Sequence, residues 1–271
     1  MGTLGACLVG VPLAFFMGIN AKTMFRKGLC FFAVACMVHV ILFSFSRGGQ
    51  LGLCIVGFTL FVIALLKLPR KGRTLLLAII FAWLGIYLAG DEVRERFWTI
   101  FADQGERDKS AASRFVTWSA AWECIKDHPL GVGPRNFNAV SHQYGLPVNK
   151  SVHNLMLQTG ADYGIFGMLG LFLFYFMSIV KSYRMASHPV AIEMGWPRYF
   201  GHMVCISLTG FMVCSVFIGM ESVETGFLIA LLGLCTVNHV YLIAEQNEVP
   251  DDSPEAERLD LYRTYGYMPP A

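Results

Sequence analysis

The chain has 271 residues, of which 55% are hydrophobic and only 15% are charged, and its mean hydropathy is +0.53. About a quarter of the residues in a soluble domain are charged, so this composition excludes an ordinary soluble fold and predicts an integral membrane protein. The formal net charge of +2 gives no sign of a nucleic-acid partner.

Seven apolar stretches approach the roughly 20 residues that a helix needs to cross a bilayer core. They are continuously apolar rather than alternating, which predicts helices and not barrel strands. We therefore expect an all-α membrane protein with about seven transmembrane helices, forming one bundle over residues 1–244. The stretches are residues 2–19, 29–45, 51–66, 74–90, 155–180, 199–219 and 226–244.

Lysine and arginine gather in alternate connections between these stretches. Short basic loops stay in the cytoplasm, so residues 91–153 are expected to form one large, partly helical exoplasmic loop. The acidic, proline-containing tail 245–271 is expected to be cytoplasmic and disordered. The basic residues are Lys22, Arg26 and Lys27, then Lys67, Arg70, Lys71 and Arg73, then Lys181, Arg184 and Arg198.

The same orientation places Met1 on the outer face. The first stretch has neither a basic start nor an evident cleavage site, so a signal peptide is not predicted. We expect the chain to be the C-terminal part of a longer membrane protein.

Arg47 interrupts a long apolar run beside Gly48 and Gly49. A cation at this depth is costly and usually faces a bundle interior or a water-filled cavity. One interpretation is an anion-binding arginine beneath the outer loop, because a guanidinium holds phosphate oxygens in pairs and keeps its charge. The alternative is snorkelling to the outer headgroups.

A helix is predicted after Lys109, where aromatic and aliphatic residues recur every three or four positions. Such a helix is expected to lie along the outer membrane surface. Arg114 in its first turn is slightly unfavourable with the helix dipole, so it is either a binding residue or a solvated charge. The stripe consists of Phe115, Trp118, Trp122 and Ile125.

Residues 128–134 carry strong turn signals after this helix. Gly131 and Gly133 lack the preceding strand and the third glycine of a dinucleotide loop, so we interpret the segment as a structural elbow. A turn that aims backbone amides into a cleft is the alternative. Arg135 belongs either to a phosphate site or to the solvated surface.

His153 opens the fifth apolar stretch. If Ser151 caps that helix, His153 lies in its first turn, where the dipole favours a neutral imidazole able to act as a general base. The alternative is an interfacial histidine. Asn154, Gln158 and Asp162 follow at spacings of four and form one polar stripe.

The sequence predicts neither a metal nor a redox site. The loop histidines His128, His142 and His153 lack the short spacing of zinc ligands. No pair of cysteines has CxxC spacing, and Cys124 is the only cysteine in the loop.

Taken in order, these motifs resemble the bacterial O-antigen ligase and O-antigen polymerase superfamily of membrane glycosyltransferases. Each motif is loose, but their order, spacing and topology together are specific and cover roughly residues 40–180. The matching elements are Ser46–Gly49, Ser113–Trp118, His128–Phe137, His153–Gln158 and Tyr163–Gly167.

The resemblance implies transfer of a glycan from a polyprenyl-diphosphate carrier, such as undecaprenyl diphosphate, to an acceptor hydroxyl on lipid A-core, another glycan or a protein. Arg47 and Arg114 would bind the diphosphate, and His153 would assist the acceptor. Asn154, Arg135, Gln158 and Asp162 are supporting candidates, and no metal or other cofactor is implied. The site would face the periplasm from a bacterial cytoplasmic membrane.

Family members usually have more spans than this chain, which puts the activity of this segment alone in question. Two other classes of function stay open. An anionic lipid or glycan transporter would show paired broken helices and repeat symmetry, which the sequence lacks. An inactive membrane scaffold would show no turnover.

Overall fold

The computed structural model describes residues 2–44, 46–67, 72, 76, 79–80, 83, 109–217 and 223–248. Within those residues all regular structure is helical, which confirms the all-α prediction for that part of the chain. The helices are α1 (Gly2–Asn20), α2 (Met24–Phe43), α3 (Arg47–Lys67), α6 (Lys109–Asp127), α7 (Phe137–Val140), the 3-10 helix η1 (Ser141–Tyr144), α8 (Leu155–Ala186), α9 (Pro189–Met194), α10 (Trp196–Ser215) and α11 (Val223–Glu248).

Six of the predicted spans correspond to α1, α2, α3, α8, α10 and α11, whereas the fourth, residues 74–90, falls largely outside the described residues. Among the described helices, three are long and apolar enough to cross a membrane: Met24–Phe43, Leu155–Ala186 and Glu224–Gln246. Gly5–Asn20 and Gly48–Ile63 are apolar but shorter. The membrane character is therefore supported, and the count of seven spans stays a prediction.

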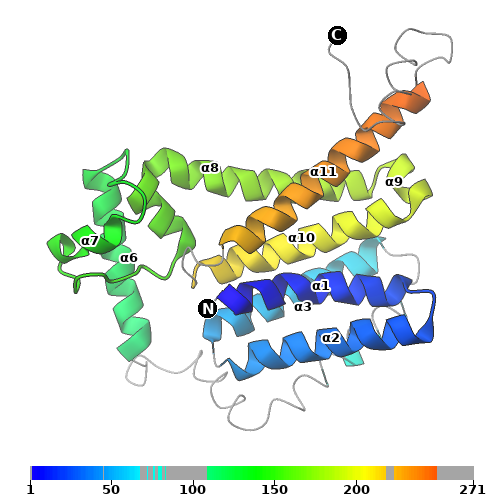
Figure 1. The fold of residues 1–271 in the computed structure, drawn as a ribbon, viewed down its shortest axis with the longest axis horizontal. Coiled ribbons are helices and arrows are strands. Elements are labelled where there is room, and N and C mark those ends of the chain that lie inside the picture. Colours follow the sequence, from blue (N-terminus) through cyan, green and yellow to red (C-terminus); the bar gives the residue numbers. More distant parts are fainter. Residues whose placement is uncertain are drawn as a thin grey trace.

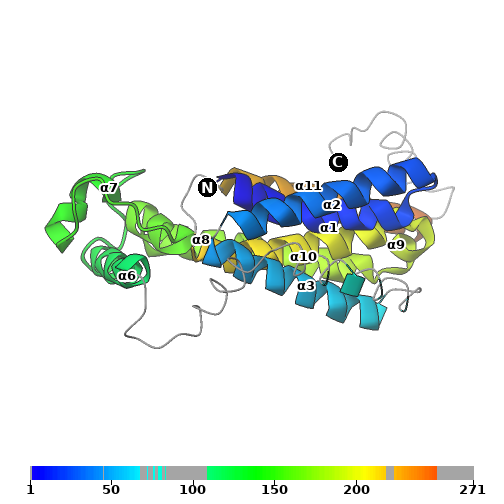
Figure 2. The ribbon, with the colours of Figure 1, turned by 90° about the horizontal axis from the view of Figure 1, so that it is seen from below.

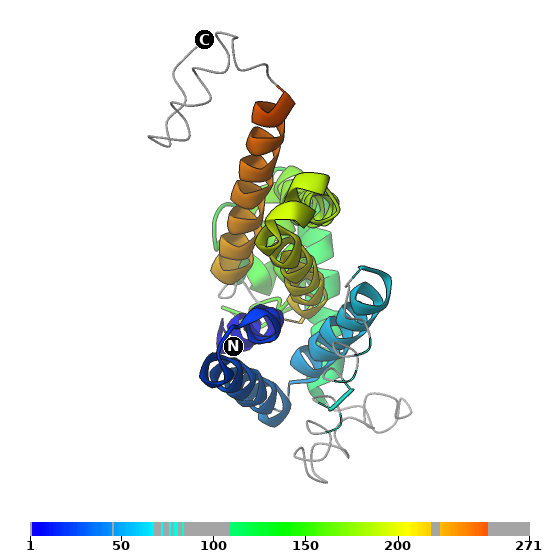
Figure 3. The ribbon, with the colours of Figure 1, turned by 90° about the vertical axis from the view of Figure 1, so that its right-hand side faces the viewer.

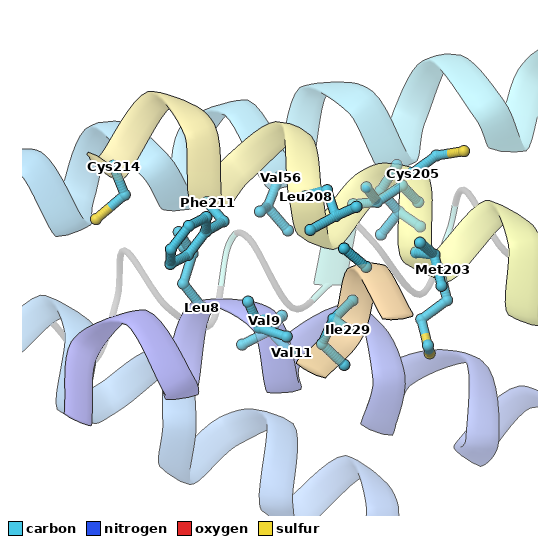
Figure 4. Close-up of a cluster of buried hydrophobic side chains, with 14 of the residues drawn as sticks. Leu8, Val9, Val11, Val56, Met203, Cys205, Leu208, Phe211, Cys214 and Ile229 are labelled. Atoms are coloured by element: carbon cyan, nitrogen blue, oxygen red, sulfur yellow. The ribbon is translucent and has the colours of Figure 1, made fainter. Parts of the chain in front are cut away.

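The bundle packs around α10, which contacts α1, α3, α8 and α11 (Figure 1). Figure 4 shows this core, with Leu8 of α1 and Val56 of α3 beside Phe211 of α10. Gly210 of α10 leaves room for the Val56 side chain of α3, since an added Cβ would overlap Val56 Cγ2, and small residues allow such close packing between membrane helices. The Ser207 hydroxyl also donates a hydrogen bond to the Val9 carbonyl (3.0 Å), which joins α10 to α1.

α1, α2 and α3 alternate in direction, and so do α8, α10 and α11, so the ends of these helices gather at two ends of the bundle (Figures 1 and 3). One end carries the α2–α3 turn, α6, α7, and the starts of α8 and α11; we call it the loop end. The other end carries the turn at residues 21–23 and the connections around α9. The basic residues Lys22, Arg184 and Arg198 lie in or next to those connections. The segments that resemble the ligase and polymerase superfamily lie at the loop end, so they and these basic residues occupy opposite ends of the bundle.

α6 crosses the loop end instead of continuing the bundle. In Figure 2 it is seen nearly along its axis while α1, α2, α3 and α10 run across the view. α6 therefore lies across the direction of the bundle, and its position along a membrane surface stays a prediction.

Candidate functional site

The amphipathic pattern of α6 divides into a packed face and an open face. Ile125 is buried and Trp118 half-buried, but Phe115 is 59% exposed and Trp122 46% exposed. The stripe read from the sequence therefore serves two environments. Its inner side packs on α8 and the following loop, and its outer side is exposed.

Arg114 of α6 contacts Phe217, which lies just beyond the end of α10 and also packs against the start of α3. The Arg114 guanidinium carbon lies 5.9 Å from the centroid of the Phe217 ring, within the range of a cation–π contact. The Trp118 ring centroid lies 6.1 Å from the same ring. The backbone of Gly48 passes so close to Phe217 that an added Cβ would overlap the Phe217 Cβ.

Arg47 is the first residue of α3 and directly precedes Gly48. Phe217 therefore links the backbone that carries Arg47 to the guanidinium of Arg114. Sequence reasoning missed Phe217 because it lies within an apolar span, where a phenylalanine carries no distinguishing signal.

Substituting Gly48 tests this junction. Gly48→Ala is expected to lower the thermal stability and the transfer activity, because the added methyl forces the first turn of α3 away from Phe217. Gly57→Ala, on the same helix with open space around its Cβ position, is the matched control and is expected to have little effect. Equal melting temperatures and activities for the two variants would contradict the close contact.

The turn at residues 128–134 packs directly on α8, as a structural elbow. Gly164 adopts φ 80° and ψ 179°, which interrupts α8, and Gly131 has φ 85°. A Cβ on Gly131 would lie 2.5 Å from the Asp162 carbonyl oxygen and from the Gly164 nitrogen, so the two backbones touch. Only glycine fits this approach.

The interruption at Gly164 also supplies hydrogen-bond partners for the turn. Carbonyls just before the break accept from turn amides instead of amides of their own helix, which satisfies both backbones. Two bonds are of this kind, Val132 N–H to Ala161 O (3.0 Å) and Gly133 N–H to Asp162 O (2.9 Å); a third runs the other way, from the Ile165 N–H just after the break to the Pro129 carbonyl of the turn (3.0 Å).

The polar stripe Asn154, Gln158 and Asp162 is buried rather than lining open space. Gln158 donates from Nε2 to Asp162 Oδ2 (3.0 Å). Asp162 Oδ1 accepts the Phe137 N–H (3.0 Å), and Gln158 Oε1 accepts the Val152 N–H (3.3 Å). These side chains tie the loop to α8.

His153 lies before α8, not in its first turn, so the predicted cap at Ser151 is wrong. Asn154 caps the helix instead, because its Oδ1 accepts the N–H groups of Met156 and Leu157 at 3.1 Å each. The first-turn argument for a neutral imidazole therefore does not apply. His153 has φ 51°, a left-handed conformation that is uncommon for residues other than glycine.

His153 is nevertheless part of the same packed unit as α6. Val152, directly before it, is fully buried in a cluster with Ala120, Ala121 and Phe137, and Trp118 packs against that cluster. Trp118 lies one helical turn after Arg114. The structure thus places the backbone of His153 and the helix of Arg114 at one end of the bundle.

Arg135 lies on the exposed side of the turn that follows the elbow. Its side chain is exposed and its backbone is left-handed, with φ 58°. Of the two interpretations, the geometry favours the solvated surface.

Cys124 is a packing residue. It is fully buried, and burial raises the pKa of its thiol above the ordinary value. The thiolate is the reactive form of cysteine, so a raised pKa disfavours the reactive form and agrees with a packing role.

Comparison with known proteins bears on this arrangement. No curated protein and no solved structure matches the chain. The family described as O-Antigen ligase matches residues 32–172, which is more than half of the chain and includes α3, α6, the elbow and the start of α8. The chain therefore belongs to the O-antigen ligase family of membrane proteins, whose members act in ligase-like or polymerase-like glycosyl transfer.

Proposed function

We propose that this protein transfers a glycan from a polyprenyl-diphosphate carrier to an acceptor hydroxyl, as an O-antigen ligase does. The observation that carries the proposal is the meeting of Arg114 with the first turn of α3 at Phe217, at the end of the bundle that also holds His153. The nearest alternatives within the same chemistry are a polysaccharide polymerase and a protein O-oligosaccharyltransferase.

In this proposal the loop end faces the periplasm. The support is charge: Lys22, Arg184 and Arg198 lie at the opposite end, and short basic connections remain in the cytoplasm. Undecaprenyl-linked donors in the outer leaflet would then reach Arg114 from the lipid. The exposed Phe115 and Trp122 on the outer side of α6 suit that interfacial position.

The proposed reaction is a displacement at the anomeric carbon of the donor. The acceptor oxygen forms a bond to that carbon as the bond from the carbon to the diphosphate oxygen breaks, and the acceptor proton passes to the His153 imidazole. Arg47 and Arg114 stabilise the negative charge that develops on the leaving diphosphate. The proposed reaction uses no metal and no nucleotide sugar.

Arg114 variants test the diphosphate role. Arg114→Ala is expected to lower kcat/KM for a polyprenyl-diphosphate-linked glycan by about 10²–10³-fold, the effect of losing one charge-stabilising group. Arg114→Lys should recover part of the activity, because lysine keeps the charge but not the paired donors. The measurement is transfer by the full-length protein in proteoliposomes.

Lys126→Ala supplies the control, since Lys126 is an exposed cation on the same helix. Its kcat/KM is expected to equal that of the wild type. Equal losses of kcat/KM in the Lys126 and Arg114 variants would show that activity depends on the overall positive charge of α6. That result would refute a specific contact between Arg114 and the diphosphate.

The acceptor is distinguished in the same assay. Supplying lipid A-core, a second lipid-linked glycan or a hydroxyl-bearing peptide separately reports ligase, polymerase or protein-transferase activity. We expect transfer to lipid A-core.

A further inference from the structure

A buried chain of hydrogen bonds runs from the start of α7 to the residue before His153. It begins at the Phe137 N–H, passes through the Asp162 carboxylate and the Gln158 amide, and ends at the Val152 N–H. Asp162 is only 1% exposed and Gln158 only 4%. Side-chain bonds so well excluded from water are costly to break, because the partner left behind stays unsatisfied.

The direction of each bond in this chain is determined. A carboxylate only accepts, so Gln158 must present its NH₂ group to Asp162 and its oxygen to Val152. Both terminal groups are backbone N–H donors. With ionised carboxylates, all three bonds are therefore satisfied when one of the two side chains is a carboxylate and the other an amide.

The bonds hold His153 from one side, and the Asn154 cap holds it from the other. Val152 is fixed by Gln158, and Asn154 is fixed by the amides of Met156 and Leu157. His153 lies between these two anchors with φ 51°. A left-handed backbone persists at a non-glycine residue only when its surroundings constrain it.

We infer that Asp162 and Gln158 are positioning residues, which aim the His153 imidazole by fixing the backbone directly before it. This inference rests on the proposed function and adds the means by which the histidine is held. Neither side chain needs to contact substrate, because both are buried and bond to each other and to loop amides.

An exchange of the two functional groups tests the inference. In Asp162→Asn, the NH₂ group of the introduced asparagine must face either the Gln158 NH₂ group or the Phe137 N–H, both of which are donors. In Gln158→Glu, two carboxylates face each other. The double variant, which combines Asp162→Asn with Gln158→Glu, restores all three bonds. The introduced glutamate accepts from the Val152 N–H and from the NH₂ group of the introduced asparagine, whose oxygen accepts the Phe137 N–H.

We expect each single variant to lower kcat for glycan transfer about tenfold or more, because small misplacements of a catalytic group have effects of that size. The double variant is expected to return to within about threefold of the wild type. KM for the lipid-linked donor should stay unchanged throughout, since the proposed donor contacts belong to Arg47 and Arg114 and not to these buried side chains. Gln143→Glu, an exposed change of the same kind in the same loop, should be silent.

Hydrogen exchange gives a second readout that is independent of activity. Peptides covering residues 147–157 should exchange faster in both single variants and return to the wild-type rate in the double variant. Unchanged kcat in the folded single variants would overturn the inference, as would a folded double variant that stays inactive. If the wild type shows no glycan transfer, the proposed function fails instead, and hydrogen exchange still decides whether the bonds hold this segment.

Discussion

Replacing His153 with asparagine is expected to reduce glycan transfer by about 10²–10⁴-fold, the usual contribution of a positioned general base. Asparagine is the informative replacement because it tolerates the left-handed backbone that the structure shows at this position. His153→Ala would add backbone strain to the loss of the imidazole, and the two effects could not be separated.

Steady-state kinetics of the full-length protein in proteoliposomes provide the measurement. The loss should appear in kcat at saturating donor, because donor binding depends on the arginines. In the wild type, kcat should fall as the pH is lowered and the imidazole becomes protonated. The variant should lack this acidic fall in kcat. This follows because a general base must be unprotonated to accept the proton from the acceptor.

His142→Asn is the matched control. His142 is an exposed histidine in the same loop, and its Nδ1 lies 2.9 Å from the Ala139 carbonyl oxygen. We expect transfer by this variant to match the wild type. A His153→Asn enzyme with normal kcat and the original pH profile would remove the histidine from the mechanism.

Gly164→Ala is expected to destabilise the protein by at least about 3 kcal/mol. The φ and ψ angles of Gly164, 80° and 179°, lie in a region that only glycine populates readily. An added Cβ would also overlap the Pro129 carbonyl oxygen and lie 2.6 Å from the Leu130 carbonyl carbon. Both neighbours are backbone atoms, so no side-chain rotation relieves the overlap.

Thermal unfolding of purified Gly164→Ala and Gly170→Ala proteins measures this effect. Gly170 lies further along α8 with open space where a Cβ would be, so Gly170→Ala should unfold at or slightly above the wild-type temperature. Gly164→Ala should also lose transfer activity, because Asp162, two residues before Gly164, belongs to the hydrogen-bond chain that reaches Val152. A Gly164→Ala protein as stable as the Gly170 variant would show that the elbow does not depend on this contact.

Several features of the fold could be predicted because they depend on local sequence. Continuous apolar stretches predicted the helices, and the three-to-four spacing after Lys109 predicted α6. The turn signals at residues 128–134 predicted the elbow. The motif order also predicted the family, which the match over residues 32–172 confirms.

The position of His153 could not be predicted in the same way. Ser151 and Asn154 are both good N-caps, and the choice between them depends on whether Val152 enters the buried cluster beside α6. Val152 does enter it, so the helix begins later and His153 falls in the preceding turn. The Tyr163–Gly167 segment did contain a signal for the break in α8, namely a glycine within a helical pattern.

The sequence by itself determined that the chain is a helical membrane protein with its basic residues and its motifs in alternate connections. Hydrophobic length and charge act over a few residues, so they can be read without knowing any neighbour. Only the tertiary structure decided that Phe217 joins Arg114 to the first turn of α3, and that Asp162 and Gln158 reach the start of α7 and Val152. Those contacts depend on how the helices pack around α10 and cross at the loop end, which no local pattern records.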